Sequence, residues 1–233
     1  KIINAYLPEN QKITRFGADS DIHIVDLYEY KDALRFTVNF LHEQLMIPIP
    51  GKVNATNAMV AAYIGMLEGV SSENIKRALA DLIKNKNRVE WLKASNGADI
   101  LSDVYNANPT AMRLILETFQ TIDRNPDGKK IAVLADMKEL GEQSPQLHRQ
   151  MITALDPQKL DLLYLYGEEI EPLAAAALTV FEPDAVKYFR KDNEKDALDA
   201  LLKDLLNTLS SQDQLLLKGS NSMKLSTLID GLC

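Results

Sequence analysis

The sequence has little of several residue types on which common functions depend. It has one cysteine in 233 residues, Cys233 at the last position, which excludes an internal disulfide framework and a cysteine-based zinc site. Its three histidines show no metal-ligand spacing, and the sequence supports no Ser/His/Asp set. His23 and His42 fall in strand-like pattern and are expected to be structural or exposed. His148 is expected at a helix surface or cap.

Phosphate-binding motifs, long apolar runs and an excess of basic residues are also missing. Gly51-Lys52-Val53 and Gly128-Lys129-Lys130 depart from G-x-x-x-x-G-K-[ST], and no G-x-G-x-x-G occurs. No apolar run approaches the roughly 18 residues of a membrane span, and no charged-then-apolar leader opens the chain. Lys and Arg number 26 against 33 Asp and Glu, a formal net charge of −7, which argues against a nucleic-acid-binding surface. We therefore expect a soluble, cytoplasmic protein.

What is present is a normal globular mixture, with 46% apolar and 25% charged residues. At roughly 150 residues per domain, the length allows one large domain or two small ones. Residues 21–30 and 34–50 alternate apolar and polar side chains, which predicts antiparallel strands in a hairpin that turns near Tyr30 to Ala33. Pro48 and Pro50 end this pattern.

Helical spacing follows at residues 54–67 and again at 71–85, where Ser71 is the expected N-cap. Beyond residue 98, short apolar runs alternate with helical segments, which indicates βαβ units. The predicted fold class is therefore α/β: a Rossmann-like, mostly parallel sheet covered by helices on both faces, preceded by a strand-rich and helical region. The expected strands are 99–104, 130–135, 160–167, 214–219 and a weaker 185–189. The expected helices are about 109–122, 145–155, 169–178, 193–209 and 222–232.

A domain boundary is placed near Arg88 to Lys93, after the polar stretch that follows the two early helices. This gives domains of residues 1–90 and 91–233.

Ligands of doubly wound sheets bind at the carboxyl ends of the strands, so the turns there are the candidate sites. After the first strand come Asp103, Tyr105, Asn106 and Asn108, followed by Pro109 at a favoured first helical position. Two asparagines and an aspartate can contact a ligand. They can equally be ordinary turn chemistry, with Asn108 as a helix N-cap.

Two further strand ends carry polar groups. Asp136 could bind a metal, an amine or a ribose, or it could cap a turn. Lys218, Gly219 and Ser220 lead into an expected helix N-terminus, a combination that suits an anion such as a carboxylate or a phosphate. The alternative is a serine cap beside a solvated lysine.

The first domain offers three candidates. Asn54 and Asn57 lie three residues apart on one helical face and could present a donor and acceptor pair to a planar base, or they could simply be polar residues at a helix start. Arg88 lies at the expected hinge, where a guanidinium could clamp a phosphate or remain on the surface.

Together these segments resemble a known family. "GKVNATNAMVAA", residues 51–62, resembles the G-x-H-N-x-x-N-x-x-A-A segment of the Mur ligases. "DVYNANPTAM", "LADMKELG" and "LKGSNSMKL" are similar to signature segments of one branch of that family, and all four occur in family order between residues 51 and 225.

The resemblance implies a three-domain, ATP-dependent amide ligase that uses Mg²⁺ and joins D-alanyl-D-alanine to UDP-N-acetylmuramoyl-tripeptide through an acyl phosphate. In the family, the central domain holds ATP and the C-terminal domain brings the amino acid or dipeptide. The chain, which begins at Lys1, would be the tail of the central domain plus the C-terminal domain. The phosphate loop and most magnesium ligands would lie upstream, so the isolated chain is expected to be inactive.

Residue by residue, the resemblance implies that Asn54 and Asn57 face the adenine, Arg88 an ATP phosphate and Asp103 the ribose. It assigns no catalytic residue and no metal ligand. The residues expected around the incoming dipeptide are Tyr105, Asn106, Asn108, Asp136, Lys218, Ser220 and Asn221.

Two positions depart from the family pattern: Val53 stands where a histidine is usual, and Asn221 where an arginine is frequent. Two alternatives stay open. One is a related ligase, either another Mur ligase or a folylpolyglutamate-type enzyme. The other is a non-catalytic binding module of the same fold.

Overall fold

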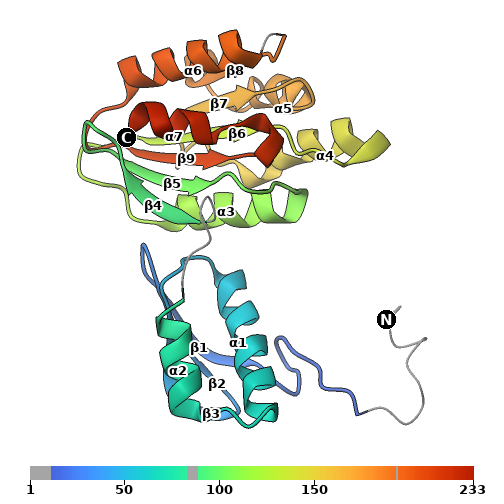
Figure 1. Cartoon of the computed structure of the whole chain (residues 1–233). Coiled ribbons are helices and arrows are strands. Elements are labelled where there is room, and N and C mark those ends of the chain that lie inside the picture. Colours follow the sequence, from blue (N-terminus) through green and yellow to red (C-terminus); the bar gives the residue numbers. More distant parts are fainter. Residues whose placement is uncertain (1–11, 83–88, 193) are drawn as a thin grey trace. The chain divides into compact units, whose positions relative to one another are not determined.

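The computed structural model describes residues 12–82, 89–192 and 194–233. The chain divides into two compact units, Lys1–Leu82 (unit 1) and Ile83–Cys233 (unit 2). Figure 1 shows the elements of both units. Arg88, the candidate phosphate contact, lies outside the described residues. No helix of the described part is long and apolar enough to cross a membrane.

Unit 1 contains a three-stranded antiparallel sheet of order β1-β2-β3 and two helices. The bounds are β1 Ile24–Glu29, β2 Leu34–Val38, β3 Leu41–Ile47, α1 Lys52–Leu67 and α2 Ser72–Ala80. The predicted hairpin is confirmed, because the Tyr30 N–H donates to the Ala33 carbonyl oxygen over 2.9 Å. Ser71 is the N-cap of α2, as predicted, and its hydroxyl accepts from the Asn74 N–H.

One expectation for unit 1 is wrong. Residues 34–50 are not one strand, since the chain turns at Asn39 and Phe40 between β2 and β3. The Asn39 carboxamide holds this turn. It accepts from the His23 N–H over 3.0 Å and donates to the Asp21 carbonyl oxygen over 2.9 Å. No glycine or proline marks the turn, and the alternation of apolar and polar residues continues into it as far as Phe40.

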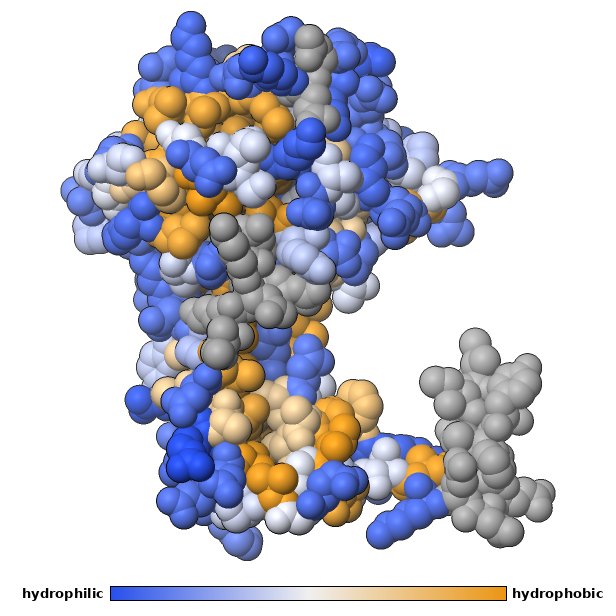
Figure 2. Space-filling model, viewed as in Figure 1, coloured by the Kyte–Doolittle hydropathy of each residue, from blue (hydrophilic) through white to orange (hydrophobic). Residues whose placement is uncertain are grey.

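The core of unit 1 lies between one sheet face and the two helices. Phe36 and Leu45 on the sheet are fully buried, and Met59 of α1 and Ile75 of α2 belong to the same cluster. The other sheet face carries exposed apolar side chains, among them Tyr28 and Met46. Figure 2 shows apolar surface over much of the displayed face of unit 1.

Unit 2 is built on a six-stranded sheet of order β4-β5-β9-β6-β7-β8. The strands are β4 Glu90–Lys93, β5 Asp99–Asp103, β6 Lys130–Ala135, β7 Leu162–Tyr166, β8 Val186–Phe189 and β9 Gln214–Lys218. Every pair is parallel except β4 with β5. This confirms the α/β class and the mostly parallel sheet. The antiparallel edge strand β4 was not predicted, because its four residues are too few to show a period.

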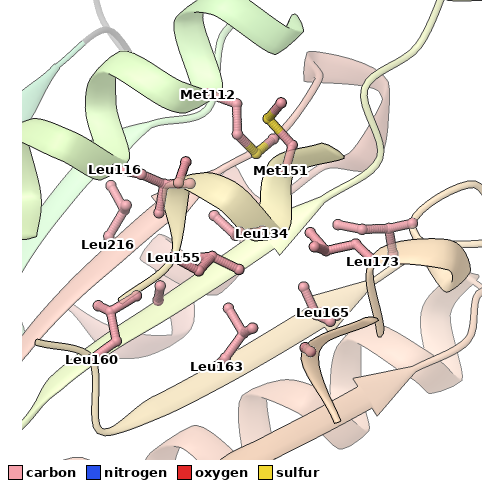
Figure 3. Close-up of a cluster of buried hydrophobic side chains, with 14 of the residues drawn as sticks. Met112, Leu116, Leu134, Met151, Leu155, Leu160, Leu163, Leu165, Leu173 and Leu216 are labelled. Atoms are coloured by element: carbon pink, nitrogen blue, oxygen red, sulfur yellow. The ribbon is translucent and has the colours of Figure 1, made fainter. Parts of the chain in front are cut away.

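Helices cover both faces of this sheet. The helices are α3 Pro109–Thr121, α4 Ser144–Gln150, α5 Glu171–Ala177, α6 Glu194–Thr208 and α7 Ser226–Leu232, with 3-10 turns η2 Gly141–Gln143, η3 Met151–Ala154, η4 Pro183–Ala185 and η5 Asn221–Met223. One core cluster joins α3, η3 and α5 to the sheet, and a second joins α6 and α7 to the opposite face. Figure 3 shows Met112 of α3 and Met151 of η3 turned toward each other, with Leu134 and Leu165 of the sheet in the same cluster.

Two of the predicted helices of unit 2 are interrupted. The segment 145–155 is divided between α4, which begins at Ser144, and η3. The segment 222–232 is broken at Lys224, which has a positive φ of 54° and separates η5 from α7. A left-handed residue ends a helical turn locally, and nothing in the apolar spacing signals it.

Candidate functional site

The candidate site of unit 2 lies where β5, β9, β6 and β7 end side by side. We call this the carboxyl edge: the strand ends and the turns at residues 103–108, 218–221, 136–141 and 167–171. In the strand register, Lys218 of β9 pairs with Asp103 of β5 on one side and with Leu134 of β6 on the other. Segments that are more than 100 residues apart in sequence, such as those containing Asp103 and Lys218, are therefore brought together as the strand pattern predicts.

The centre of the carboxyl edge is a buried ion pair. The Lys218 side chain is 1% exposed, and its Nζ lies 2.8 Å from Asp103 Oδ2. The same ammonium donates to the Asp103 carbonyl oxygen over 3.3 Å and to the Asn106 carbonyl oxygen. Lys218 is therefore neither a solvated lysine nor part of an open anion site, because the Asp103 carboxylate on the neighbouring strand neutralises its charge.

The turn from β5 into α3 carries three predicted dipeptide contacts. Tyr105, Asn106 and Asn108 are all exposed, whereas Ala107 between them is buried and anchors the turn. Asn108 is also the N-cap of α3, since its Oδ1 accepts from the Ala111 N–H over 2.8 Å. Tyr105 and Asn106 therefore present their side chains at the surface, while the side-chain oxygen of Asn108 is engaged in capping α3.

Asp136 at the end of β6 caps the turn after β7. It is fully buried, and its Oδ1 accepts from the Ile170 N–H over 2.9 Å while Oδ2 accepts from the Glu168 N–H over 3.2 Å. Gly167 makes this approach possible: its φ is +134°, and a Cβ there would lie 2.0 Å from Asp136 Oδ1. Of the roles considered for this residue, turn capping is the one the structure displays.

Ser220 joins the end of β9 to the end of β6. Its N–H donates to the Asp136 carbonyl oxygen over 3.2 Å, and its hydroxyl accepts from the Lys138 N–H over 3.0 Å. Asn221, the next residue, is exposed. The helix expected directly after this segment is only the 3-10 turn η5, so the anion site expected at a helix N-terminus has no α-helix behind it.

A polar network that the sequence analysis missed links the turns after β6 and β7. Lys138 Nζ bonds to Asp136 Oδ2 over 2.9 Å and to Glu169 Oε1 over 2.8 Å. Burial disfavours the charge of Lys138, but its hydrogen bonds to Glu169 and Asp136 raise its pKa above the ordinary value. Burial likewise opposes ionisation of Glu169, yet hydrogen bonds from Lys138 and Ser144 lower the pKa of this carboxyl.

His148 completes this network, and the expectation that it lies at a surface or a cap is wrong. Its side chain is fully buried, and Nε2 accepts from the Met137 N–H over 2.9 Å. Nδ1 lies 2.8 Å from the Ser144 carbonyl oxygen, which assigns the ring proton to Nδ1. His148 lies on the buried face of α4, one turn after Ser144. The i, i+4 spacing of these two residues is the one sequence signal for their contact.

A pocket of about 540 Å³ opens between the turns after β6 and β7. Glutamates dominate its lining, and the sequence-predicted site residues do not line it. The lining residues are Glu139, Leu140, Gly141, Ser144, Pro145, Glu168, Glu169, Glu171 and Pro172. Among the described residues, no group of three histidine, cysteine or acidic side chains is placed to hold a metal ion.

The nucleotide candidates of unit 1 lie at the start of α1. The Asn54 carboxamide donates to the Pro50 carbonyl oxygen over 2.7 Å, so it closes the turn into the helix. Asn57 is exposed one turn later on the same face, and Val53 is 40% exposed. Asn57 is thus presented to solvent, while Asn54 has a local structural partner.

The carboxyl edge can position a substrate, but it contains no activated nucleophile. In the turns at residues 103–108 and 218–221 its exposed groups are carboxamides and a phenol, which donate and accept hydrogen bonds without charge, whereas the turns after β6 and β7 expose glutamates. Its buried charges are paired: Lys218 with Asp103, and Asp136 with Lys138. This chemistry suits recognition and orientation of a small polar molecule.

Comparison with known proteins defines the class. The Mur ligase, glutamate ligase domain family matches residues 87–221, and the chain belongs to this family. A UDP-N-acetylmuramoyl-tripeptide–D-alanyl-D-alanine ligase from Bacillus subtilis (strain 168) is 32% identical over 216 residues, which are 93% of this chain and 46% of the relative. The chain spans about half the length of the relatives it matches.

Solved structures of Mur ligases superpose on this chain. MurF from Acinetobacter baumannii superposes with a TM-score of 0.77 at 26% identity, covering 94% of this chain and 46% of that protein. MurF from Thermotoga maritima in complex with ADP superposes with a TM-score of 0.72 at 21% identity, covering 94% and 47%. The second likeness shows the fold alone.

Proposed function

We propose that this chain is the part of an ATP-dependent ligase that positions D-alanyl-D-alanine for addition to UDP-N-acetylmuramoyl-tripeptide. The observation that carries the proposal is the convergence of three distant segments, 103–108, 136–141 and 218–221, at one edge of the sheet. Asp103 meets Lys218 at 2.8 Å, and Ser220 meets Asp136 at 3.2 Å. Their similarity to Mur ligase segments supports the assignment, as does the activity for which the similar proteins are named.

The reaction needs activation of a carboxylate, because an amine and a carboxylate do not condense at neutral pH. The terminal carboxylate of the tripeptide takes the γ-phosphoryl group of ATP, the dipeptide amine attacks the carbonyl carbon, and inorganic phosphate leaves with a proton lost from nitrogen. In this proposal the carboxyl edge contributes orientation. Tyr105, Asn106 and Asn108 hold the dipeptide with neutral hydrogen-bonding groups, and Asn221 adds another exposed carboxamide.

The nucleotide is held only in part by this chain. Asn57 and Asn54 at α1 would face the adenine, and Asp103 the ribose. The sequence has no glycine-rich phosphate loop. The resemblance to the Mur ligases implies that most Mg²⁺ ligands belong to the part of the ligase outside this chain.

An acceptor panel tests the proposal. The longer protein encoded by the gene that carries this sequence is assayed with ATP, Mg²⁺ and UDP-N-acetylmuramoyl-tripeptide, with D-alanyl-D-alanine, glutamate or diaminopimelate as acceptor, and with a folate and glutamate as a second pair. ADP release and the mass of the product are measured. We expect product only with D-alanyl-D-alanine. Product only with another acceptor would replace the proposal by a related ligase, and product with none would favour a binding module.

The isolated chain is the matched control in the same assay. We expect no ATP hydrolysis and no ligation from it, because it lacks a phosphate loop. Turnover by this polypeptide alone would show that the division of labour proposed here is wrong.

A further inference from the structure

Lys218 occupies the most enclosed polar position at the carboxyl edge. It is the last residue of β9, a strand with neighbours on both sides, and its side chain is 1% exposed. A lysine is almost never buried so completely without a partner that neutralises its charge. The partners must therefore define what this residue does.

Three acceptors of the Lys218 ammonium belong to one turn. They are the Asp103 carboxylate at 2.8 Å, the Asp103 carbonyl oxygen at 3.3 Å and the Asn106 carbonyl oxygen. An ammonium group has three protons, and this turn offers an acceptor for each of them. A substrate carboxylate could take one of them only at the expense of a buried hydrogen bond.

The turn that Lys218 holds carries the candidate contacts to the ribose of ATP and to the dipeptide. Asp103, the candidate ribose contact, begins it, and the exposed side chains of Tyr105 and Asn106 project from its middle. Asn108 ends it as the N-cap of α3. Displacing the Asn106 carbonyl oxygen would therefore shift the dipeptide contacts and the start of α3 together.

We infer that Lys218 is a positioning residue rather than a substrate contact: it fixes the turn 103–108 through the Asn106 carbonyl oxygen and the Asp103 carboxylate. This inference rests on the proposed function for its consequence in catalysis. Its structural half, the fixing of the turn, stands on the contacts alone. The two halves are tested by separate experiments.

The structural half is tested in this chain by hydrogen exchange. Ala111 and Met112 are suitable reporters, because their N–H groups donate to the Asn108 side chain and carbonyl oxygen. We expect Lys218→Met to accelerate exchange at these two amides about tenfold or more, with smaller changes in α5. Unchanged exchange at Ala111 and Met112 would overturn the inference.

Lys130 supplies a matched control. It is also a buried lysine, 3% exposed, and its ammonium also donates to backbone carbonyl oxygens, those of Phe119 and Ile122, but it lies at the opposite end of the neighbouring strand β6. Lys130→Met should leave exchange at Ala111 within twofold of the wild type. Equal acceleration in both variants would mean general loosening of unit 2 and would contradict the inference.

The catalytic half is tested in the longer protein with two acceptors, D-alanyl-D-alanine and its C-terminal amide. If Lys218 only positions the turn, Lys218→Met lowers kcat/KM for both acceptors by the same factor, about tenfold or more, and the ratio between them stays within twofold. If Lys218 binds the dipeptide carboxylate, the wild-type preference for the free acid disappears in the variant. Loss of that preference would overturn the inference.

Lys218→Arg serves where Lys218→Met does not fold. It keeps the charge, but a planar guanidinium cannot place one nitrogen among the three acceptors, so we expect the same equal loss for both acceptors. If the wild-type protein ligates neither acceptor, the proposed function fails, while the exchange experiment still decides whether Lys218 fixes the turn.

Discussion

The two units of the chain differ in how completely their sheets are covered. In unit 2, helices pack on both faces of the six-stranded sheet, and the interior residues of its central strands are fully buried. In unit 1, α1 and α2 pack on one face of the three-stranded sheet. The exposed apolar residues of the strands, hairpin turn and helices of unit 1 include Val25, Tyr28, Tyr30, Met46, Val53, Ile64 and Leu67.

The difference affects how much apolar surface each unit buries. Burying apolar surface stabilises a domain by roughly 25 cal/mol per Å², and small domains bury a smaller fraction of their surface. Unit 1 leaves apolar side chains in water on its sheet and on α1, whereas unit 2 contains two apolar cores. We therefore expect equal chemical changes to cost more free energy in unit 2 than in unit 1.

The largest contrast is expected for leucine truncation. Leu134→Ala in β6 removes a fully buried side chain from the core of unit 2 and should lower its free energy of unfolding by about 3 to 5 kcal/mol. Leu67→Ala at the end of α1, where the side chain is 62% exposed, should change the stability of unit 1 by less than about 0.5 kcal/mol. Urea unfolding measures both, with Trp91 fluorescence reporting unit 2. An equal loss of unfolding free energy in the two variants would contradict the expected difference between the units.

Glycine replacement should show the next largest difference. Gly167→Ala would place a Cβ 2.0 Å from Asp136 Oδ1 at a φ of +134°, which should cost about 3 kcal/mol. Gly69→Ala in unit 1 also has a positive φ, +80°, but no atom within 4 Å, so it should cost only about 1 kcal/mol. Thermal unfolding measures the two. A Gly167→Ala variant as stable as Gly69→Ala would show that Asp136 does not clamp the turn after β7.

Lys130 gives unit 2 an alkaline pH dependence. Burial, followed by repulsion from Arg124, lowers the pKa of Lys130 from 10.5 to about 8. The unfolded chain then binds more protons between these values, so the free energy of unfolding rises with pH from about 8 to about 10.5. At pH 10 the gain for wild type, relative to Lys130→Met, should be about 2 kcal/mol.

Urea unfolding of the wild type and Lys130→Met at pH 7 and pH 10 measures this effect, because the variant cancels the titration of every other group. A difference between the two proteins that stays constant over this range would contradict the lowered pKa.

The smallest contrast concerns tyrosine hydroxyls. The Tyr164 hydroxyl of β7 donates to Asp204 Oδ2 over 2.7 Å, so Tyr164→Phe should cost about 1 kcal/mol. Tyr28 of β1 is 56% exposed, and Tyr28→Phe should leave the stability of unit 1 unchanged within about 0.3 kcal/mol. Chemical denaturation resolves the two, and a measurable loss at Tyr28 would indicate a partner on the exposed sheet face.

Local sequence signals predicted most of the fold. The alternation near residue 24, the hairpin at Tyr30 and the repeat of strand and helix beyond residue 98 all follow from periodicity that one segment carries by itself. The turn at Asn39 and the break at Lys224 were missed, because single residues make them with hydrogen bonds or a left-handed backbone that no pattern displays.

For the candidate site, the sequence predicted which strand ends lie together, but not the hydrogen-bond and ion-pair partners of the residues there. Asp103, Asp136 and Lys218 could be predicted to lie close together, because each lies at the end of a strand and parallel strands end at the same edge of a sheet. Their partners depend on tertiary structure. The pairing of Lys218 with Asp103 and the burial of His148 come from elements that are distant in sequence or from the inner face of a short helix.

Under the proposed function the two units have separate tasks: Asn57 of unit 1 would contact the adenine, and Asn106 of unit 2 would contact the dipeptide. The most direct test is steady-state kinetics of Asn57→Ala and Asn106→Ala in the longer protein. We expect Asn57→Ala to raise KM for ATP at least about fivefold with KM for D-alanyl-D-alanine within twofold, and Asn106→Ala to do the reverse. If both variants alter the same KM, or neither variant alters either KM, the proposed division of tasks between the two units is wrong.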